Sequence, residues 1–228
     1  MNEPAELGGH ALSSDGRHRR RGKTRQKLVA AAKTVMANAP AEAVTIDQIT
    51  QSANVGRGSF YNHFSSMDDL FASTLEDLIS DIGHSFAAGR RAFDDIADFA
   101  AWSIQFLVQR AVDDPQLGWF IANNVKSQPL LKAHIDPRAR AAVIHGAQEG
   151  RFQLPDPELW LSIGMASTTA FIRGCLEGRF VVTQSVDLAA SILQAAGLSR
   201  SEAKQIARRC DPTMMGGALG MHRTKTRE

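Results

Sequence analysis

The chain has 228 residues, 43% of them apolar, and a formal net charge of +2, which excludes a disordered or strongly charged chain and allows a small domain plus one larger core. No apolar stretch follows Met1, which argues against a signal peptide, and the most apolar helix candidate, residues 159–172, is too short to span a bilayer. The two cysteines lie far apart in no metal-ligand spacing, as is common in a reducing compartment. We therefore expect a cytoplasmic protein with no membrane segment, metal or cofactor.

Positive charge gathers near the start of the chain. Residues 17–27, RHRRRGKTRQK, contain seven Lys/Arg and no acid. Residues 17–70 contain nine Lys/Arg against four Asp/Glu, whereas residues 71–199 contain ten against fourteen. This distribution favours binding to a polyanion, because each neutralised phosphate releases condensed counterions. Taken alone, a basic run is equally compatible with a localisation signal or a solvated tail.

Most of the chain shows helical periodicity, which Pro and Gly residues interrupt, and it shows almost no alternating β pattern. The pattern predicts an all-α protein whose first helix spans about 24–38, between flexible tails at 1–16 and 211–228. Beyond residue 66, helices are expected near 67–88, 94–111, 115–126, 137–149, 156–177, 186–196 and 199–209.

The run TIDQITQSANVGRGSFYNHFSSMDDL, residues 45–70, predicts two short helices at a tight turn, followed by a third. A T-x-x-Q capping box at 45–48 can start the first of these helices. Asn54 tolerates the left-handed backbone conformation that a sharp turn needs. Phe60 and Phe64, four residues apart, define the buried face of the second helix. This pattern is typical of a helix-turn-helix, whose usual target is DNA.

The opposite face of that second helix is short and polar. Its first residues are small, so the start of the helix can approach phosphates closely. Arg57 can reach a guanine edge or a phosphate, and the polar side chains at 61–63 can donate to backbone oxygens or bases.

The segment from about 24 to 75 resembles the DNA-binding domain of the tetracycline-repressor (TetR/AcrR) family of transcriptional regulators, over about a quarter of the chain. The resemblance lies in the pattern above, with its apolar-Tyr-x-His-Phe core at 60–64 and the helix start at 68–71. It implies a homeodomain-like three-helix domain with a basic arm over 17–70, and a larger helical ligand-binding and dimerisation domain over 71–210. The operator contacts that it implies are Thr45, Arg57, Gly58, Ser59, Tyr61, Asn62 and His63.

Two positions depart from the family pattern. Asn54 stands where the family usually has glycine, a mild conformational change. Met67 stands where the family often has a phosphate-contacting lysine, so no role is carried over to Met67.

The predicted helix at 156–177 carries a small side chain at every fourth position, which lets another helix approach closely. These positions are Ser162, Ala166, Ala170, Gly174 and Gly178. The resemblance implies that this helix and one of the two that follow pair across a two-fold axis in a four-helix bundle, although packing within one subunit is equally compatible. A homodimer is expected in any case, because reading a palindrome needs two recognition helices about 34–36 Å apart.

Trp and Phe residues concentrate between positions 86 and 180, and they can line an apolar cavity, although helical packing alone also produces aromatic stripes. The resemblance favours an apolar or amphipathic effector that moves the subunits through the helix at 67–88. The candidate ligand contacts are Trp102, Phe106, Trp119, Phe120, Asn123, Met165 and Phe171, with Asn124 or His134 as further polar candidates.

The sequence contains no G-x-S-x-G elbow, phosphate loop, dinucleotide glycine fingerprint, H-E-x-x-H or C-x-x-C, and its seven histidines are scattered. An enzyme is therefore not expected. The interpretation is a ligand-responsive transcriptional regulator, with repression favoured, that binds a palindromic double-stranded operator as a dimer and is released by a small molecule. A ligand-independent architectural DNA-binding protein is the alternative.

Overall fold

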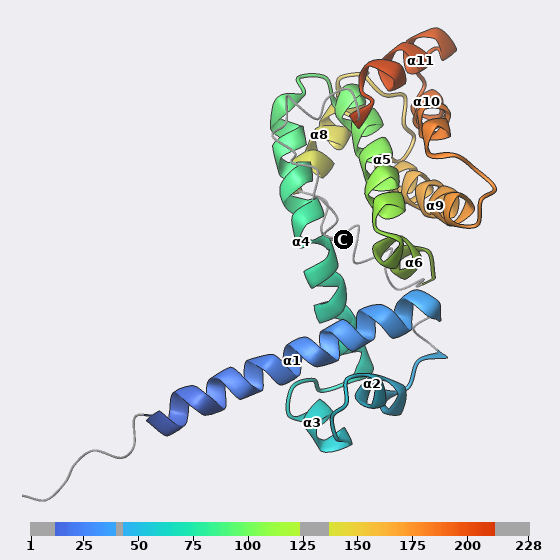
Figure 1. Ribbon diagram of the computed structural model, residues 1–228. Helices are drawn as coiled ribbons and strands as arrows, with labels where there is room; N and C mark the ends of the chain where they lie inside the picture. Colours follow the sequence, from blue (N-terminus) through green and yellow to red (C-terminus); the bar gives the residue numbers. More distant parts are fainter. Residues whose placement is uncertain (1–11, 40–42, 124–136, 213–228) are drawn as a thin grey trace, which may run out of the picture.

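The computed structural model describes residues 12–39, 43–123 and 137–212, and within these ranges every regular element is a helix (Figure 1). This confirms the all-α class. The helices are α1 (Leu12–Asn38), α2 (Ile46–Ser52), α3 (Arg57–Tyr61), α4 (Met67–Ala92), α5 (Ile96–Asp113), α6 (Pro115–Asn123), α8 (Pro137–Gln148), α9 (Pro157–Leu176), the 3-10 turn η2 (Val182–Gln184), α10 (Ser185–Ala195) and α11 (Arg200–Arg209).

The helices α1, α2 and α3 form a small head with the start of α4 (Figure 1). Its centre is fully buried and apolar, with Leu28, Met36, Ile49 and Phe60 each at 0% exposure. Phe64 packs beside Phe60 with ring centroids 5.9 Å apart. The prediction that the two phenylalanines point into the core is therefore confirmed.

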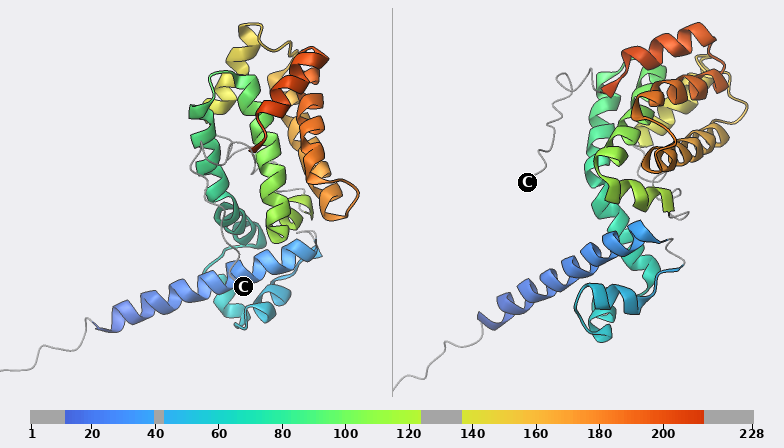
Figure 2. Two further views of the ribbon diagram at one scale, coloured as in Figure 1. Left: turned by 45° about the horizontal axis from the view of Figure 1, so that its top comes forward. Right: turned by 45° about the vertical axis from the view of Figure 1, so that its right-hand side comes forward.

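The first helix is longer than predicted. It begins at Leu12 rather than near 24, so residues 12–16, expected in a tail, are helical. No proline interrupts residues 12–38, and the Arg, Lys, Gln and Ala residues in this stretch favour helix. The N-terminal part of α1 projects away from the rest of the molecule (Figures 1 and 2). Residues 1–11 and 213–228 of the expected tails lie outside the described residues.

The long helix α4 leaves the head and continues into the larger domain (Figure 1). Ser66 caps it by accepting from the Asp69 N–H at 3.2 Å, and the acids Asp68 and Asp69 lie in its first turn, where the helix dipole favours them. Leu70 is buried in the head and Ile82 is buried further along the same helix. One continuous helix thus supplies side chains to both parts of the molecule.

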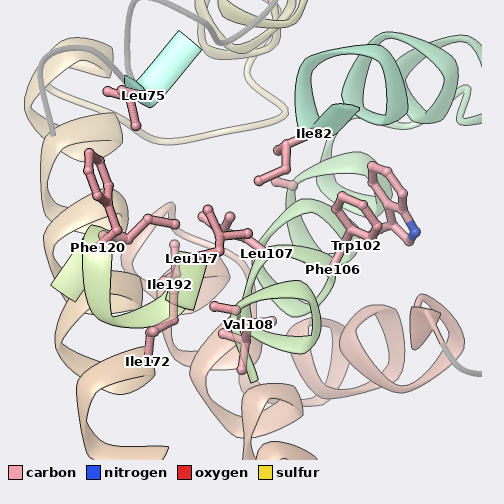
Figure 3. Close-up of a cluster of buried hydrophobic side chains, with 14 of the residues drawn as sticks. Leu75, Ile82, Trp102, Phe106, Leu107, Val108, Leu117, Phe120, Ile172 and Ile192 are labelled. Atoms are coloured by element: carbon pink, nitrogen blue, oxygen red, sulfur yellow. The ribbon is translucent and has the colours of Figure 1, made fainter. Parts of the chain in front are cut away.

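In the larger domain α5 is central and lies between α4 and the pair α10 and α11 (Figure 2). Its buried residues include Trp102 and Phe106, whose rings stack with centroids 4.9 Å apart (Figure 3). Arg151 joins α5 to α11, because it lies 2.7 Å from Asp95 and 2.8 Å from Glu202. These contacts hold α11 against the core.

The helix α9 confirms the helix predicted at 156–177, and it extends beyond the most apolar part of that helix, residues 159–172. At 20 residues, Pro157–Leu176 is long and apolar enough to cross a membrane by length and composition, so the expectation that it is too short is wrong. It is longer because Asp156 caps it upstream and it continues to Leu176. A core helix of a soluble protein passes the same test, and Trp160, Thr168 and Ile172 are buried within the fold. The length of α9 is therefore weak evidence for a membrane segment.

Candidate nucleic-acid interface and effector cavity

The turn between α2 and α3 has the local geometry that the sequence predicts. The Gln48 N–H donates to Thr45 Oγ1 at 3.3 Å, and the Thr45 N–H donates to Gln48 Oε1 at 2.8 Å, which confirms the capping box. Asn54 has φ of +53°, which confirms its left-handed conformation. The Val55 N–H then donates to the Thr50 carbonyl at 3.0 Å. These bonds set the direction in which α3 leaves α2.

The helix α3 is only five residues long, and its polar face is open to solvent. Tyr61 is 54% exposed, and a Cβ added at Gly58 would meet no atom within 4 Å. Asn62 and His63 lie in the turn that follows α3 rather than on the helix itself. All seven predicted DNA-contacting residues are exposed or half-buried at the end of the molecule that carries α2 and α3.

Arg57 is held by an acid that the sequence analysis did not single out. Its Nη1 donates to Asp47 Oδ1 at 3.0 Å and to Oδ2 at 3.1 Å, so a side chain of α2 orients a side chain of α3. Hydrogen bonding with Tyr61 and the charge of Asp47 raise the pKa of Arg57, which stays cationic. The ten-residue separation of Asp47 and Arg57 carries no local signal, because only the angle between the two helices brings them together.

The basic run of α1 lies beside the end of α3. Arg21 donates from Nη2 to the Asn62 carbonyl at 3.2 Å. Arg25 donates to Ser73 Oγ at 3.1 Å and lies over the Phe64 ring at 5.4 Å. Partial burial, together with the charges of Arg21 and Arg25, lowers the pKa of His63. Positive charge is therefore placed next to the exposed polar residues.

A cavity of about 120 Å³ lies in the larger domain. Three of its walls come from one face each of α4, α5 and α9, and α8 and α10 complete it. Its lining residues are Ile82, Gly83, Phe86, Phe99, Ala100, Ser103, Ile104, Leu107, Arg140, Val143, Trp160, Leu161, Gly164, Met165, Thr168 and Ile192. Most of these side chains are apolar, so the cavity suits an apolar guest.

Of the seven predicted ligand contacts, only Met165 lines this cavity. Trp102 and Phe106 are buried behind one wall, where both pack against Phe86 with centroids 6.0 and 5.8 Å away. Phe171 instead stacks on Phe180 at 5.1 Å. An aromatic stripe predicts burial but does not tell which neighbour covers each ring.

The other three predicted contacts belong to α6, which packs against the head. Phe120 stacks on Phe71 of α4 at 5.3 Å, and Asn123 donates from Nδ2 to the Ala37 carbonyl of α1 at 2.8 Å. Trp119 is half-buried on the same helix. Asn124 and His134 lie outside the described residues. The structure thus places Phe120 and Asn123 at the junction between the two parts of the molecule.

Comparisons with known proteins agree with this architecture. Residues 28–74 match the model of bacterial regulatory proteins of the tetR family, and residues 95–209 match the tetracyclin repressor-like C-terminal domain. The crystal structure of RolR in complex with the ligand resorcinol is 31% identical, with a TM-score of 0.65, and the match covers 84% of this chain and 96% of that one. RolR without ligand is 30% identical, with a TM-score of 0.62, and the match covers 81% and 96% of the two chains.

A more distant structure is FadR from Bacillus subtilis in complex with stearoyl-CoA. It is 14% identical, with a TM-score of 0.54, and the match covers 73% of this chain and 96% of that chain. At this identity the match supports the fold alone. Among curated protein sequences none matches. The family models and the RolR match show that the chain belongs to the TetR family. It is a transcriptional regulator with a helix-turn-helix DNA-binding domain and a C-terminal ligand-binding domain, and not an enzyme.

Proposed function

We propose that this protein is a cytoplasmic, ligand-responsive repressor, which binds a palindromic operator as a homodimer and leaves it when a small effector fills the cavity. The observation that carries the proposal is the continuity of α4. Leu70 and Leu75 of this helix are buried, Leu70 within the head, while Ile82 and Phe86 line the cavity. A displacement of α4 at the cavity would therefore also move the part of α4 that packs in the head, beside the DNA-binding residues.

The exposed polar residues of the head supply the contacts with the operator. In this proposal Arg57 reads a base edge, and the other predicted positions, Thr45, Gly58, Ser59, Tyr61, Asn62 and His63, contact bases or position the backbone. The exposed cations Arg19, Lys23 and Lys27 of α1 follow the phosphates.

The outer face of α9 supports the dimer. Leu159 and Ile163 are 57% and 50% exposed, although both are large and apolar, and Ala166 and Ala170 lie exposed further along the helix. The last part of the small-residue stripe packs within the subunit instead. At Gly174 the Phe180 ring lies so close that an added Cβ would be 2.3 Å from it. We assign the first part of the stripe to contact with a second copy of the chain, where burial of apolar area favours association.

The size of the cavity supports a small effector. An apolar cavity of about 150 Å³ holds a benzene molecule, so about 120 Å³ is the scale of one aromatic ring. RolR, the 31% identical relative, binds resorcinol, a single ring. Binding at the walls formed by α4 and α9 would shift the two heads relative to each other, and a coupling of about 1–3 kcal/mol would change operator affinity several-fold to a hundred-fold.

The test has two steps. Selection of bound sequences from random DNA should recover a palindrome, since two related heads read two half-sites. Binding to that sequence is then measured at fixed salt, with and without resorcinol and other single-ring compounds. Operator binding that one compound relieves, with little effect on random DNA, is expected. Uniform binding to any duplex, unaffected by every compound, would instead favour the architectural alternative.

A further inference from the structure

The two hydroxyl groups in the cavity wall, those of Ser103 and Thr168, share one property, which is that each already donates its hydrogen. Ser103 lies on the α5 face formed by Ala100, Ile104 and Leu107, and Thr168 lies on the α9 face formed by residues 161, 164 and 165. Because these residues have the three- and four-residue spacing of one helix face, both hydroxyl groups belong to the cavity-facing sides of their helices.

Each of these hydroxyl groups donates within its own helix. Ser103 Oγ donates to the Phe99 carbonyl at 2.7 Å, and Thr168 Oγ1 donates to the Gly164 carbonyl at 2.7 Å. A hydroxyl group has one proton and two acceptor lone pairs. With the proton committed to the preceding turn, each oxygen remains able to accept but not to donate.

Two nitrogen donors of the wall, Trp160 Nε1 and Arg140 Nε, have partners within the protein. The Trp160 Nε1–H donates to the Ile192 carbonyl at 3.1 Å. Arg140 is the one cation among the described residues that line the cavity, and its Nε donates to Glu158 Oε1 at 2.6 Å. The charge of Arg140 is thus balanced by a carboxylate before any guest arrives.

We propose that the cavity selects guests that donate hydrogen bonds, namely a single aromatic ring carrying one or two hydroxyl groups, whose protons go to Ser103 Oγ and Thr168 Oγ1. This inference rests on the proposed function and names the class of its effector. An aldehyde or ether of the same size offers only acceptors, and the hydroxyl groups of Ser103 and Thr168 have no hydrogen left to donate to them. A carboxylate would also have to compete with Glu158 for Arg140. Such guests would lose bonds to water that the two hydroxyl groups cannot replace.

The experiment is calorimetric titration of the full-length protein with four guests of similar size: phenol, toluene, benzaldehyde and benzoate. Phenol is expected to bind at least about tenfold more tightly than toluene or benzaldehyde, and benzoate is expected to bind most weakly. Resorcinol should exceed phenol, whereas 1,3-dimethoxybenzene, which keeps the oxygens but loses both protons, should not.

Two variants locate the acceptors. Ser103→Ala and Thr168→Val should each weaken phenol binding about threefold to tenfold and leave toluene binding unchanged. The matched controls are Ser191→Ala and Thr74→Val, which remove the same kind of bond to the carbonyl four residues earlier at positions that do not line the cavity. Because the readout is the ratio of phenol to toluene affinity within one variant, a general loosening of the fold cancels.

The inference would be overturned by equal affinities for phenol and toluene, or by a preference for benzaldehyde or benzoate. Such a result would leave the proposed function intact, because an apolar or anionic effector would still act through the cavity. Unchanged phenol-to-toluene ratios in both variants would also overturn the inference. If phenol binds with the expected selectivity but no hydroxylated ring releases operator DNA, the inference holds and the proposed regulation fails.

Discussion

The carboxylate of Asp47 on α2 holds the guanidinium of Arg57 on α3, with Nη1 3.0 Å from Oδ1 and 3.1 Å from Oδ2. Both side chains are exposed, at 60% for Arg57 and 69% for Asp47, so their contribution to folding stability is small. The main effect of this ion pair is to fix the direction of the Arg57 side chain. The arginine that we propose reads a guanine is held in place by an acid on the same exposed surface of the head.

Arg57→Ala should therefore weaken binding to the selected operator by about 1–3 kcal/mol and weaken binding to random DNA much less. Asp47→Asn should lower the ratio of specific to random affinity, because the guanidinium is no longer fixed, and should raise affinity for random DNA, because a negative charge near phosphates is gone. Fluorescence anisotropy with both duplexes at one salt concentration measures the two effects. Equal losses on both duplexes for Arg57→Ala would show that Arg57 reads no base.

The basic residues of α1 should contribute equally to the affinity for DNA of any sequence. Replacing Arg19, Lys23 and Lys27 with glutamine should weaken operator and random DNA binding together and should reduce the salt slope by about 0.9 for each phosphate that is no longer neutralised. The matched control replaces Lys204 and Arg208, exposed cations on α11 at the opposite end of the molecule from α3 (Figure 1). A slope unchanged in the α1 variant would mean that this helix does not follow the DNA backbone.

The backbone at Asn54 gives a stability prediction. At φ of +53°, alanine should cost about 1 kcal/mol of unfolding free energy because of its Cβ, whereas glycine should be neutral or slightly stabilising. Chemical denaturation of Asn54→Ala and Asn54→Gly measures the difference. Alanine as stable as glycine would contradict a left-handed turn at this position.

His63 gives a prediction about pH. Its pKa is lowered by partial burial and by Arg21 and Arg25, so the ring is neutral in the free protein at pH 7. DNA phosphates would raise that pKa, and binding would then take up a proton. Operator affinity should consequently rise as the pH falls below about 6.5, and His63→Gln should remove most of this rise. A pH profile that is the same in the variant would exclude His63 from the contact with phosphates.

Asn123 should act in communication rather than in ligand binding, because its amide bonds to the Ala37 carbonyl of α1. Asn123→Ala should leave the effector Kd unchanged and should change the coupling between effector and operator by about 0.5–2 kcal/mol. Gln109→Ala, which removes a bond within α5 alone, serves as the control. A tenfold loss of effector affinity with unchanged coupling would restore Asn123 as a ligand contact.

The sequence by itself determined the helix-turn-helix, because its signals are local. The capping box at 45–48, the left-handed Asn54 and the Phe60–Phe64 pair each depend on residues within a few positions of one another, so each could be predicted from spacing alone. The exposed polar face follows from the same short segment, and the positive charge from the separate run at 17–27, although only the fold brings that run beside α3.

Only the tertiary structure decided the position of the cavity and the partner of Arg57. Helical periodicity shows that Trp102 and Met165 each face inward, but it does not show that Met165 meets open space while Trp102 is covered by Phe86 and Phe106. Which residues face a cavity depends on the angles and distances between helices far apart in the chain. The packing of whole helices sets those angles, and they cannot be predicted from a local sequence pattern.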